Sequence, residues 1–177
     1  MRLFILTPLL VLAACSEGEQ PAKKETDAPA PSQLTAGQWE MTSEVTKVTN
    51  RDKGSPAIPA AEGSKTTASS CVAPADVKKP QPALFVGEGY DCTTRDAYMS
   101  RGRANVTLAC KKAGLPGDIA TVVNGTFTAD TFEGTTTTET SLVGEGDVKI
   151  EAKLTGRRTG ECTAAAAEGE KGSGKAG

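Results

Sequence analysis

Apolar and polar residues alternate near the start of the folded part of the chain. Trp39, Met41 and Val45 are separated by acidic or hydroxyl residues, and the run begins just after Gly37. A period of two places successive side chains on opposite faces of an extended strand. The pattern therefore predicts a half-buried β-strand in this segment.

The chain that follows is rich in Thr, Val and Gly, a composition typical of strands separated by turns. Further strands are predicted at residues 65–72, 90–99, 103–111, 119–128, 131–142 and 147–158. Residues 50–63 are predicted to form a loop and 115–118 a turn. Residues 74–79 are predicted to form one helical turn, which Pro80 and Pro82 would end.

Short turns between successive strands favour antiparallel neighbours. The chain has one Trp, two Tyr and four Phe, so a flat sheet would have a thin core and exposed edges. We therefore expect an all-β fold, an antiparallel meander of six or seven strands. Its sheet would be strongly curved or partly closed like a barrel, and stapled by disulfides.

Composition removes several classes of function. The 177 residues include no histidine, so zinc hydrolases and Ser-His-Asp enzymes would lack their central residue. A net charge of -2 without a basic cluster provides no electrostatic footprint for nucleic acid. We expect no cofactor, no metal and no nucleic-acid partner.

Residues 1–14 have the pattern of an export signal. Arg2 supplies a positive charge, residues 3–12 are apolar except at Thr7 and Pro8, and two alanines follow. A run of this length cannot cross a hydrocarbon core of roughly 30 Å, which needs about 20 helical residues. We expect this segment to be a signal peptide that is removed.

The residues Leu12-Ala13-Ala14-Cys15 resemble the lipobox of bacterial lipoproteins, in which the Cys thiol is acylated and becomes the first residue of the mature chain. Lipidation of Cys15 would leave four of the five cysteines to form pairs. The resemblance implies a membrane partner through the lipid anchor. By the sorting pattern of such lipoproteins, Ser16 implies the periplasmic face of the outer membrane. The alternative is a secreted protein, cut after Ala14, that keeps a free thiol.

The mature chain divides into three segments. Residues 15–33 are expected to form a lipidated N-terminus and a flexible linker, because they contain three prolines and six charges but no large apolar side chain. Such a linker spans roughly 20–25 Å on average. Residues 34–162 are expected to form the β-domain and 163–177 a disordered tail, although the alanines at 164–167 are also compatible with a short helix.

Cysteine spacing predicts two disulfides. Cys92 and Cys110 each lie nine residues from Arg101, so a hairpin that turns there would place them opposite one another. Cys71 and Cys162 would then form the second pair. The two loops would contain 19 and 92 residues, and closing them would contribute about 3 and about 4–5 kcal/mol. A redox or metal site is disfavoured, because there is neither a Cys-x-x-Cys pair nor a histidine.

Several short motifs together resemble a bacterial family known as the domain of unknown function 3617. They are Leu34-x-x-Gly37-x-Trp39, the segment from Cys71 to Asp76, the paired Cys92 and Cys110, and the closing segment from Gly156 to Cys162. The resemblance covers essentially the whole expected domain. It implies a periplasmic or lipoprotein β-domain with cysteine pairs, and it brings no catalytic residues.

Few residues offer a setting for catalysis. The candidates are Ser64 beside Lys65, the pair Ser69 and Ser70, and the acidic pairs Asp91 with Asp96 and Glu145 with Asp147. A Ser-Lys dyad needs a buried lysine, and nothing around Lys65 predicts burial. A calcium loop needs more oxygen ligands than two acids supply. We expect all of these residues to lie in loops or at strand edges.

Four arginines have the most scope to bind a carboxylate or phosphate, namely Arg101, Arg103, Arg157 and Arg158. Successive residues of a strand point to opposite faces, so only one of Arg157 and Arg158 could enter a given site. We expect a solvated strand end that pairs with Glu161.

Two hypotheses of function follow. The first is a non-catalytic binding or interaction module of the cell envelope, whose curved sheet holds a small apolar ligand or contacts an envelope protein. The second is an envelope hydrolase or transferase with an unrecognised site. A concave cavity lined by Trp39, Val45, Phe85, Phe127 and Phe132 would support ligand binding, whereas a solid core would favour protein contact.

Overall fold

The computed structural model describes residues 33–144 and 146–162. These residues form seven strands and one short helix. The strands are β1 (Gly37–Asn50), β2 (Lys65–Val72), β3 (Tyr90–Ser100), β4 (Arg103–Lys112), β5 (Leu115–Phe127), β6 (Thr131–Leu142) and β7 (Val148–Gly160), and the helix is α1 (Ala83–Val86). All neighbouring strands are antiparallel. The expectation of an all-β, antiparallel, curved fold is confirmed.

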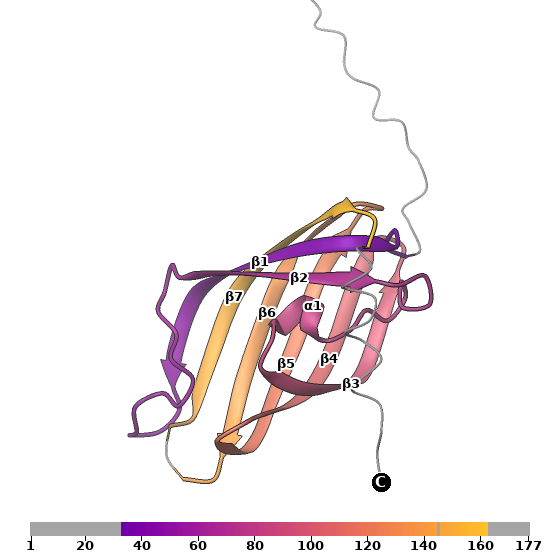
Figure 1. Cartoon of the computed structure of the whole chain (residues 1–177). Coiled ribbons are helices and arrows are strands. Elements are labelled where there is room, and N and C mark those ends of the chain that lie inside the picture. Colours follow the sequence, from indigo (N-terminus) through magenta and orange to yellow (C-terminus); the bar gives the residue numbers. More distant parts are fainter. Residues whose placement is uncertain (1–32, 145, 163–177) are drawn as a thin grey trace, which may run out of the picture.

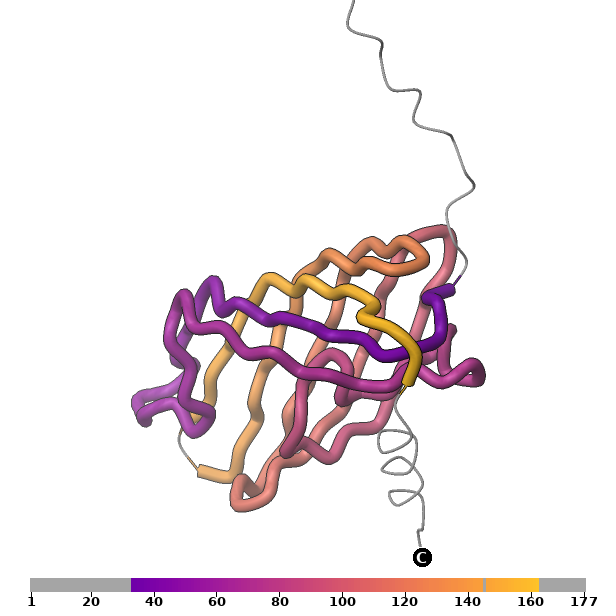
Figure 2. The backbone as a smooth tube through the Cα atoms, turned by 45° about the horizontal axis from the view of Figure 1, so that its top comes forward, coloured from indigo at the N-terminus to yellow at the C-terminus, as the bar shows by residue number. Residues whose placement is uncertain are grey.

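The strands form a single sheet in the order β2-β1-β7-β6-β5-β4-β3. Strands β3 to β7 form a continuous meander, and the β1–β2 hairpin joins its far side because β1 pairs with β7. The sheet curls into a half-barrel, so that β1 and β2 cross in front of β4–β6 in both Figure 1 and Figure 2. Helix α1 lies inside the curl, against β2.

Irregular pairing accompanies the curl. The register shifts in β1 between Val45 and Lys47, in β3 between Thr94 and Asp96, and in β4 between Cys110 and Lys112. An extra residue in one strand bends that strand and increases the local twist. The long strands can therefore wrap around a core that has few aromatic side chains.

The helix does not lie where the sequence indicated. Residues 74–79 form turns instead of an α-helix, and the N–H groups of Asp76 and Lys79 each donate to the carbonyl three residues earlier, at 2.9 Å. Helix α1 begins just after Pro82, which we expected to end the helical turn at 74–79. A proline is tolerated at the start of a helix because the first N–H groups have no partner within the helix.

The expected turn at 115–118 is also wrong. These residues open β5, and Leu115 pairs with Lys112 of β4. The reversal lies one step earlier, at Ala113 and Gly114. Gly114 has a φ of 79°, a conformation that glycine adopts without steric cost.

Large side chains fill one end of the concave face. We call this region the packed end and define it by Trp39, Met41, Phe85, Phe127 and Phe132, all of which are buried. The Phe85 ring of α1 rests on Phe132, with the ring centroids 5.9 Å apart. The helix therefore closes this end of the half-barrel with its own apolar side chains.

Two glycines make room for the Phe132 ring. Gly125 of β5 and Gly134 of β6 are register partners. A Cβ atom on Gly125 would lie 2.7 Å from Phe132 Cζ, and one on Gly134 would lie 3.0 Å from Phe132 Cε1. Because real Cβ atoms do not approach other carbons so closely, these two positions require glycine if the ring is to lie flat on the sheet.

Candidate functional site

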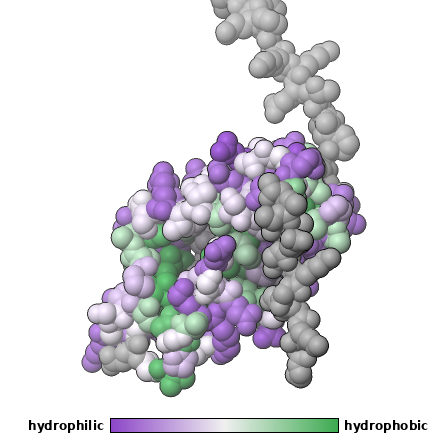
Figure 3. Space-filling model, viewed as in Figure 1, coloured by the Kyte–Doolittle hydropathy of each residue, from purple (hydrophilic) through white to green (hydrophobic). Residues whose placement is uncertain are grey.

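The concave face also contains a cleft. Its volume is about 990 Å³, and it is bordered by strands β1, β2, β5, β6 and β7, by α1 and by loop residues 58–60. In Figure 3 hydrophobic side chains line a recess on this face. The volume lies at the upper end of the range of roughly 300–1,000 Å³ for small-molecule sites.

The floor of the cleft consists of short or β-branched side chains. We call this region the open end and define it by Val45, Thr136, Thr138, Ile150 and Ala152. Val45 lies opposite Ala152, Ala152 opposite Thr136, and Ile150 opposite Thr138 in the sheet. Partners in register on one face lie side by side. The open end is thus a continuous patch over three strands, made of side chains shorter than those of the packed end.

Hydroxyl groups are distributed over this apolar floor. The Oγ1 atoms of Thr121 and Thr138 are 3.0 Å apart and share a hydrogen bond. Ser43 of β1 and Thr66 of β2 are register partners, and both line the cleft. A hydroxyl can donate one hydrogen bond and accept two. The lining therefore combines hydrocarbon with neutral hydrogen-bonding groups.

The cleft has almost no charge. Glu88 is the only charged side chain among the described residues that line it. Tyr90 borders the same space, and burial raises the pKa of its phenol above the usual 10.0. The phenol is therefore neutral at physiological pH. Lys112, which does not line the cleft, places its Nζ 4.2 Å from the centre of the Tyr90 ring.

A carboxylate ties together two loops at the mouth of the half-barrel. Asp52, in the β1–β2 loop, accepts hydrogen bonds from the backbone N–H groups of Asp147 (2.9 Å), Gly54 (2.8 Å) and Gly146 (2.8 Å). Because these N–H groups stabilise the ionised form, they lower the pKa of Asp52 below its ordinary value of 3.8, Asp147 contributing most. The loop that carries the cleft residues 58–60 is thereby fixed to the β6–β7 turn.

Asp147, one member of the predicted acidic pair, has a structural role at this turn. Asp147 accepts hydrogen bonds from the Thr140 hydroxyl at 3.0 Å and from the N–H of Leu142 at 2.8 Å. The Thr140 hydroxyl also accepts a hydrogen bond from the N–H of Val148 at 2.8 Å. Neither Thr140 nor Asp147 lines the cleft. Glu145, the other predicted member of the pair, lies outside the described residues.

The remaining catalytic candidates are not assembled into a site. Ser64, Lys65, Ser69, Asp91 and Asp96 are exposed. The Nζ of Lys65 lies 3.2 Å from Glu44 Oε2, which keeps the amine in an exposed ion pair. Ser69 and Ser70 border the cleft from edge strand β2. None of the described interactions gives either serine a lysine or an acid as a hydrogen-bond partner.

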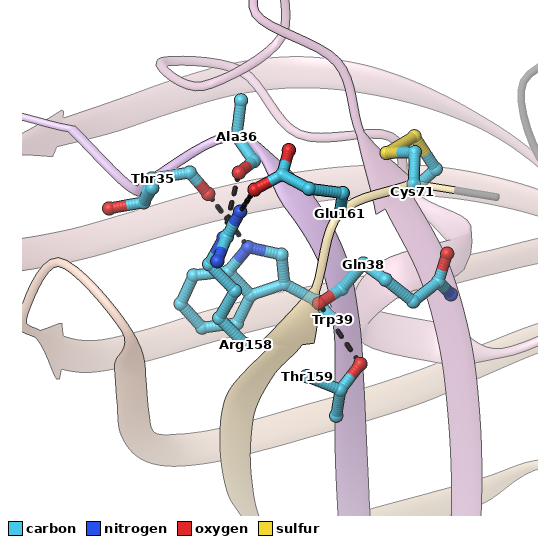
Figure 4. Close-up of a disulfide and its surroundings, with 9 residues drawn as sticks. Thr35, Ala36, Gln38, Trp39, Cys71, Arg158, Thr159 and Glu161 are labelled. Atoms are coloured by element: carbon cyan, nitrogen blue, oxygen red, sulfur yellow. Dashed lines mark hydrogen bonds and ion pairs between the residues drawn. A yellow bond between two sulfur atoms is a disulfide. The ribbon is translucent and has the colours of Figure 1, made fainter.

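Two of the four arginines are used within the fold. Arg157 Nη2 lies 2.9 Å from Glu40 Oε1. On the opposite face Arg158 pairs with Glu161, as the sequence predicts, and its Nε donates to the Ala36 carbonyl at 2.8 Å (Figure 4). The Trp39 indole lies beside this pair and donates its own N–H to the Thr35 carbonyl at 2.9 Å. Arg101 and Arg103 are exposed at the β3–β4 turn.

The four cysteines of the domain form the two predicted pairs. Cys92 and Cys110 are register partners in the β3–β4 hairpin and form a disulfide with a Cα–Cα distance of 4.0 Å. Cys71 of β2 joins Cys162, just beyond β7, with a Cα–Cα distance of 5.4 Å. Cys71 is the register partner of Gln38, beside which this second crosslink lies (Figure 4). Cys15, the signal peptide, residues 163–177 and most of the predicted linker lie outside the described residues.

The cavity predicted around five mostly aromatic residues is only partly present on the concave face. Of the five residues expected around a cavity, Val45 and Phe85 border the cleft. Trp39, Phe127 and Phe132 belong to the packed end, where large side chains leave no comparable space. One face thus contains both a solid core and a cleft, the two outcomes that we treated as alternatives.

Thr136 and Thr138 lie within the strand predicted at residues 131–142, but no role in a site was predicted for them. Both lie on the concave side and line the cleft. Thr136 is only 7 % exposed. The available signal is the alternation within β6, where Phe132, Gly134, Thr136 and Thr138 share one face.

The fold and the site define a class of protein: a curled antiparallel sheet, crosslinked by two disulfides, with a solid core at one end and an open cleft at the other. The chain belongs to the family described as protein of unknown function (DUF3617), whose model matches residues 34–162. The resemblance inferred from the motifs is confirmed. No curated protein and no solved structure matches the chain.

Two further features are absent from residues 33–144 and 146–162. These residues contain no helix that is long and apolar enough to cross a bilayer. They also contain no group of three or more His, Cys, Asp or Glu side chains that could hold a metal ion.

Proposed function

We propose that this protein is a membrane-anchored periplasmic lipoprotein whose β-domain is a non-catalytic module that binds a small apolar ligand in the cleft. The supporting observation is the unfilled volume of about 990 Å³ beside the packed end. Apolar side chains that face an open cleft stay in contact with water and make fewer packing contacts, so the domain loses the stabilisation that filling this space would give. A domain that only contacted other proteins through its outer surface would gain nothing from that loss.

Sequence features support a periplasmic, membrane-anchored location. The lipobox-like residues that end at Cys15 and the polar linker that follows imply an acylated chain held close to a bilayer. Two disulfides in the domain favour an oxidising compartment such as the periplasm. A tether of roughly 20–25 Å would keep the cleft near the membrane, where apolar molecules are concentrated.

Purification of the native chain from an envelope detergent extract, followed by mass spectrometry, tests both the lipid anchor and the binding of a ligand. We expect an intact mass that includes acyl chains on Cys15, no free thiols at the four domain cysteines, and a small apolar molecule that co-purifies. An unacylated chain would contradict the anchor. An acylated chain without any co-purified small molecule would contradict the binding function.

A matched pair of variants locates the binding. Thr136→Leu adds bulk to the floor of the cleft, whereas Thr137→Leu adds the same bulk to the opposite face of the same strand. We expect the co-purified molecule to be lost from the first variant and kept by the second. Retention of the molecule by both variants would place it elsewhere on the protein.

A further inference from the structure

The chemistry of the cleft restricts the polar part of its ligand. Among the described residues that line it there is no lysine or arginine, and Glu88 is the only carboxylate. Two lysines lie near lining residues, but neither lines the cleft itself. Lys65 pairs with Glu44, and Lys112 lies over the ring of Tyr90. A ligand inside the cleft would therefore find no cation among the lining residues to neutralise a carboxylate or a phosphate.

An anion buried without a partner is costly, because it loses hydration that nothing replaces. A neutral polar group loses less, and it regains that loss if it forms hydrogen bonds in the site. The cleft offers such bonds on two sides. Thr136 and Thr138 belong to β6, and Ser43 lies on β1 beyond the intervening strand β7.

The apolar part of the lining lies between these hydroxyls. Val45, Ile150 and Ala152 cover the floor along β1 and β7, and Val86 of α1 borders the same space. A hydrocarbon chain on this floor would keep hydroxyl groups within its reach. The lining therefore fits a molecule with both characters better than a pure hydrocarbon.

We propose that the ligand is an amphipathic lipid whose polar group is uncharged, such as an ester, an amide or an alcohol attached to a hydrocarbon chain. This inference rests on the proposed function and deepens it by naming the ligand class. The hydrocarbon covers the open end, and the neutral polar group exchanges hydrogen bonds with the threonine and serine hydroxyls. Ionised fatty acids and lipid phosphates are discriminated against, because the lining provides no cation for them.

The test uses the whole mature polypeptide with Cys15→Ser, exported behind a leader that is removed without acylation, so that the disulfides form and the protein is free of its own lipid. Three probes share a twelve-carbon chain: 1-monolauroylglycerol (neutral), laurate (anionic) and dodecyltrimethylammonium (cationic). Calorimetric titration at pH 8 gives the three values of Kd. Each probe is kept below the concentration at which it self-assembles. We expect monolauroylglycerol to bind at least about tenfold more tightly than laurate.

The outcomes separate this proposal from the one on which it rests. Laurate binding as tightly as monolauroylglycerol would overturn the ligand class while leaving the apolar site intact. Tightest binding of dodecyltrimethylammonium would also overturn it, in favour of recognition of a cation by Glu88. If none of the three probes binds, the proposed binding function itself is wrong.

Variants that lack a hydroxyl test the proposed hydrogen bonds between the cleft and the polar group of the lipid. Thr136→Val keeps the side-chain shape and removes the hydroxyl, and Ser43→Ala does the same from the β1 side. We expect each to weaken monolauroylglycerol binding by about threefold to tenfold, with laurate unchanged. Thr137→Val, on the opposite face, is the matched control. Near-ultraviolet circular dichroism and the thiol count verify folding. Unchanged monolauroylglycerol affinity in both folded variants would contradict the proposal.

Discussion

The packed end and the open end lie on the same face of the same strands, yet their side chains differ in size and chemistry. In β6, Phe132 is 1 % exposed and supports α1, whereas Thr136, four residues further along the same face, lines the cleft. In β1, Trp39 is fully buried, whereas Val45 borders open space. The sheet thus has large buried side chains at one end and a cleft lined by smaller side chains at the other.

Helix α1 marks the boundary between the two regions. Its Phe85 packs on Phe132 of the packed end and also borders the cleft, together with Ala83 and Val86. Cys71 of the Cys71–Cys162 crosslink is the register partner of Gln38, and both residues border the cleft. If this division is correct, substitutions at the two ends should differ in cost, even where the residues are equally buried.

The largest effect is expected from loss of the Cys71–Cys162 crosslink. Replacing Cys71 and Cys162 by Ser should lower the free energy of unfolding by about 4–5 kcal/mol, because the disulfide closes a long loop and restricts the unfolded chain. The matched removal of Cys92 and Cys110, which closes a shorter loop, should cost about 3 kcal/mol. Urea unfolding of both double variants measures the two values. A greater cost for the hairpin pair would contradict the loop-length explanation.

The second-largest effect is expected from truncating a side chain, and its cost in stability should differ between the two ends. Phe132→Ala should lower the free energy of unfolding by about 3–5 kcal/mol, because it leaves a cavity beneath Phe85. Val45→Ala at the open end should cost less than about 1 kcal/mol, because its side chain already faces open space. Denaturant unfolding with intact disulfides provides both numbers. Similar costs would mean that the open end is packed as tightly as the other.

Enlarging a buried alanine also compares the packed end with the open end, but it adds side-chain volume instead of removing it. Ala152 and Ala104 are 4 % and 5 % exposed, but only Ala152 faces the large cleft. Ala104→Leu should cost about 1–3 kcal/mol through overpacking, whereas Ala152→Leu should change stability by less than about 1 kcal/mol. Thermal unfolding measures the shift in each variant. A large destabilisation by Ala152→Leu would show that the cleft cannot accept added volume.

The smallest effect concerns pH and the loops at the mouth. The pKa of Asp52 is lowered in the folded chain, so its contribution to stability is complete above the ordinary value of 3.8 and is lost as the pH falls through the lowered pKa. Asp52→Asn should therefore flatten the loss of stability in this acidic window. Urea unfolding from pH 6 to pH 2 compares the two proteins. If the free energy of unfolding changed with pH in the same way in both proteins, Asp52 would not be the source of this pH dependence.

Some of these features could be predicted from the sequence because they depend on local spacing. The period of two around Trp39 placed a strand, and nine residues on each side of Arg101 placed Cys92 opposite Cys110. Each of these inferences needs only the geometry of an extended chain and a tight turn. They were correct for that reason, and Cys71–Cys162 followed by elimination.

Other features depend on contacts that spacing does not encode. Helix α1 forms after Pro82 because Leu84 and Phe85 become buried inside the curl, where tertiary contacts outweigh the local signal. The inward position of Thr136 and Thr138 was missed for a similar reason. A threonine run has the same composition whether it faces solvent or a cleft, and only the sheet register distinguishes the two.

By itself the sequence determined the strands, the pairing of four sulfur atoms and the motifs that link the chain to its family. All of these are encoded by residues close together in sequence or by the number of cysteines available. Tertiary structure alone decided which end of the concave face is filled. That outcome depends on how far the sheet curls, on where Phe85 comes to rest against Phe132, and on which small side chains then face each other across unoccupied space.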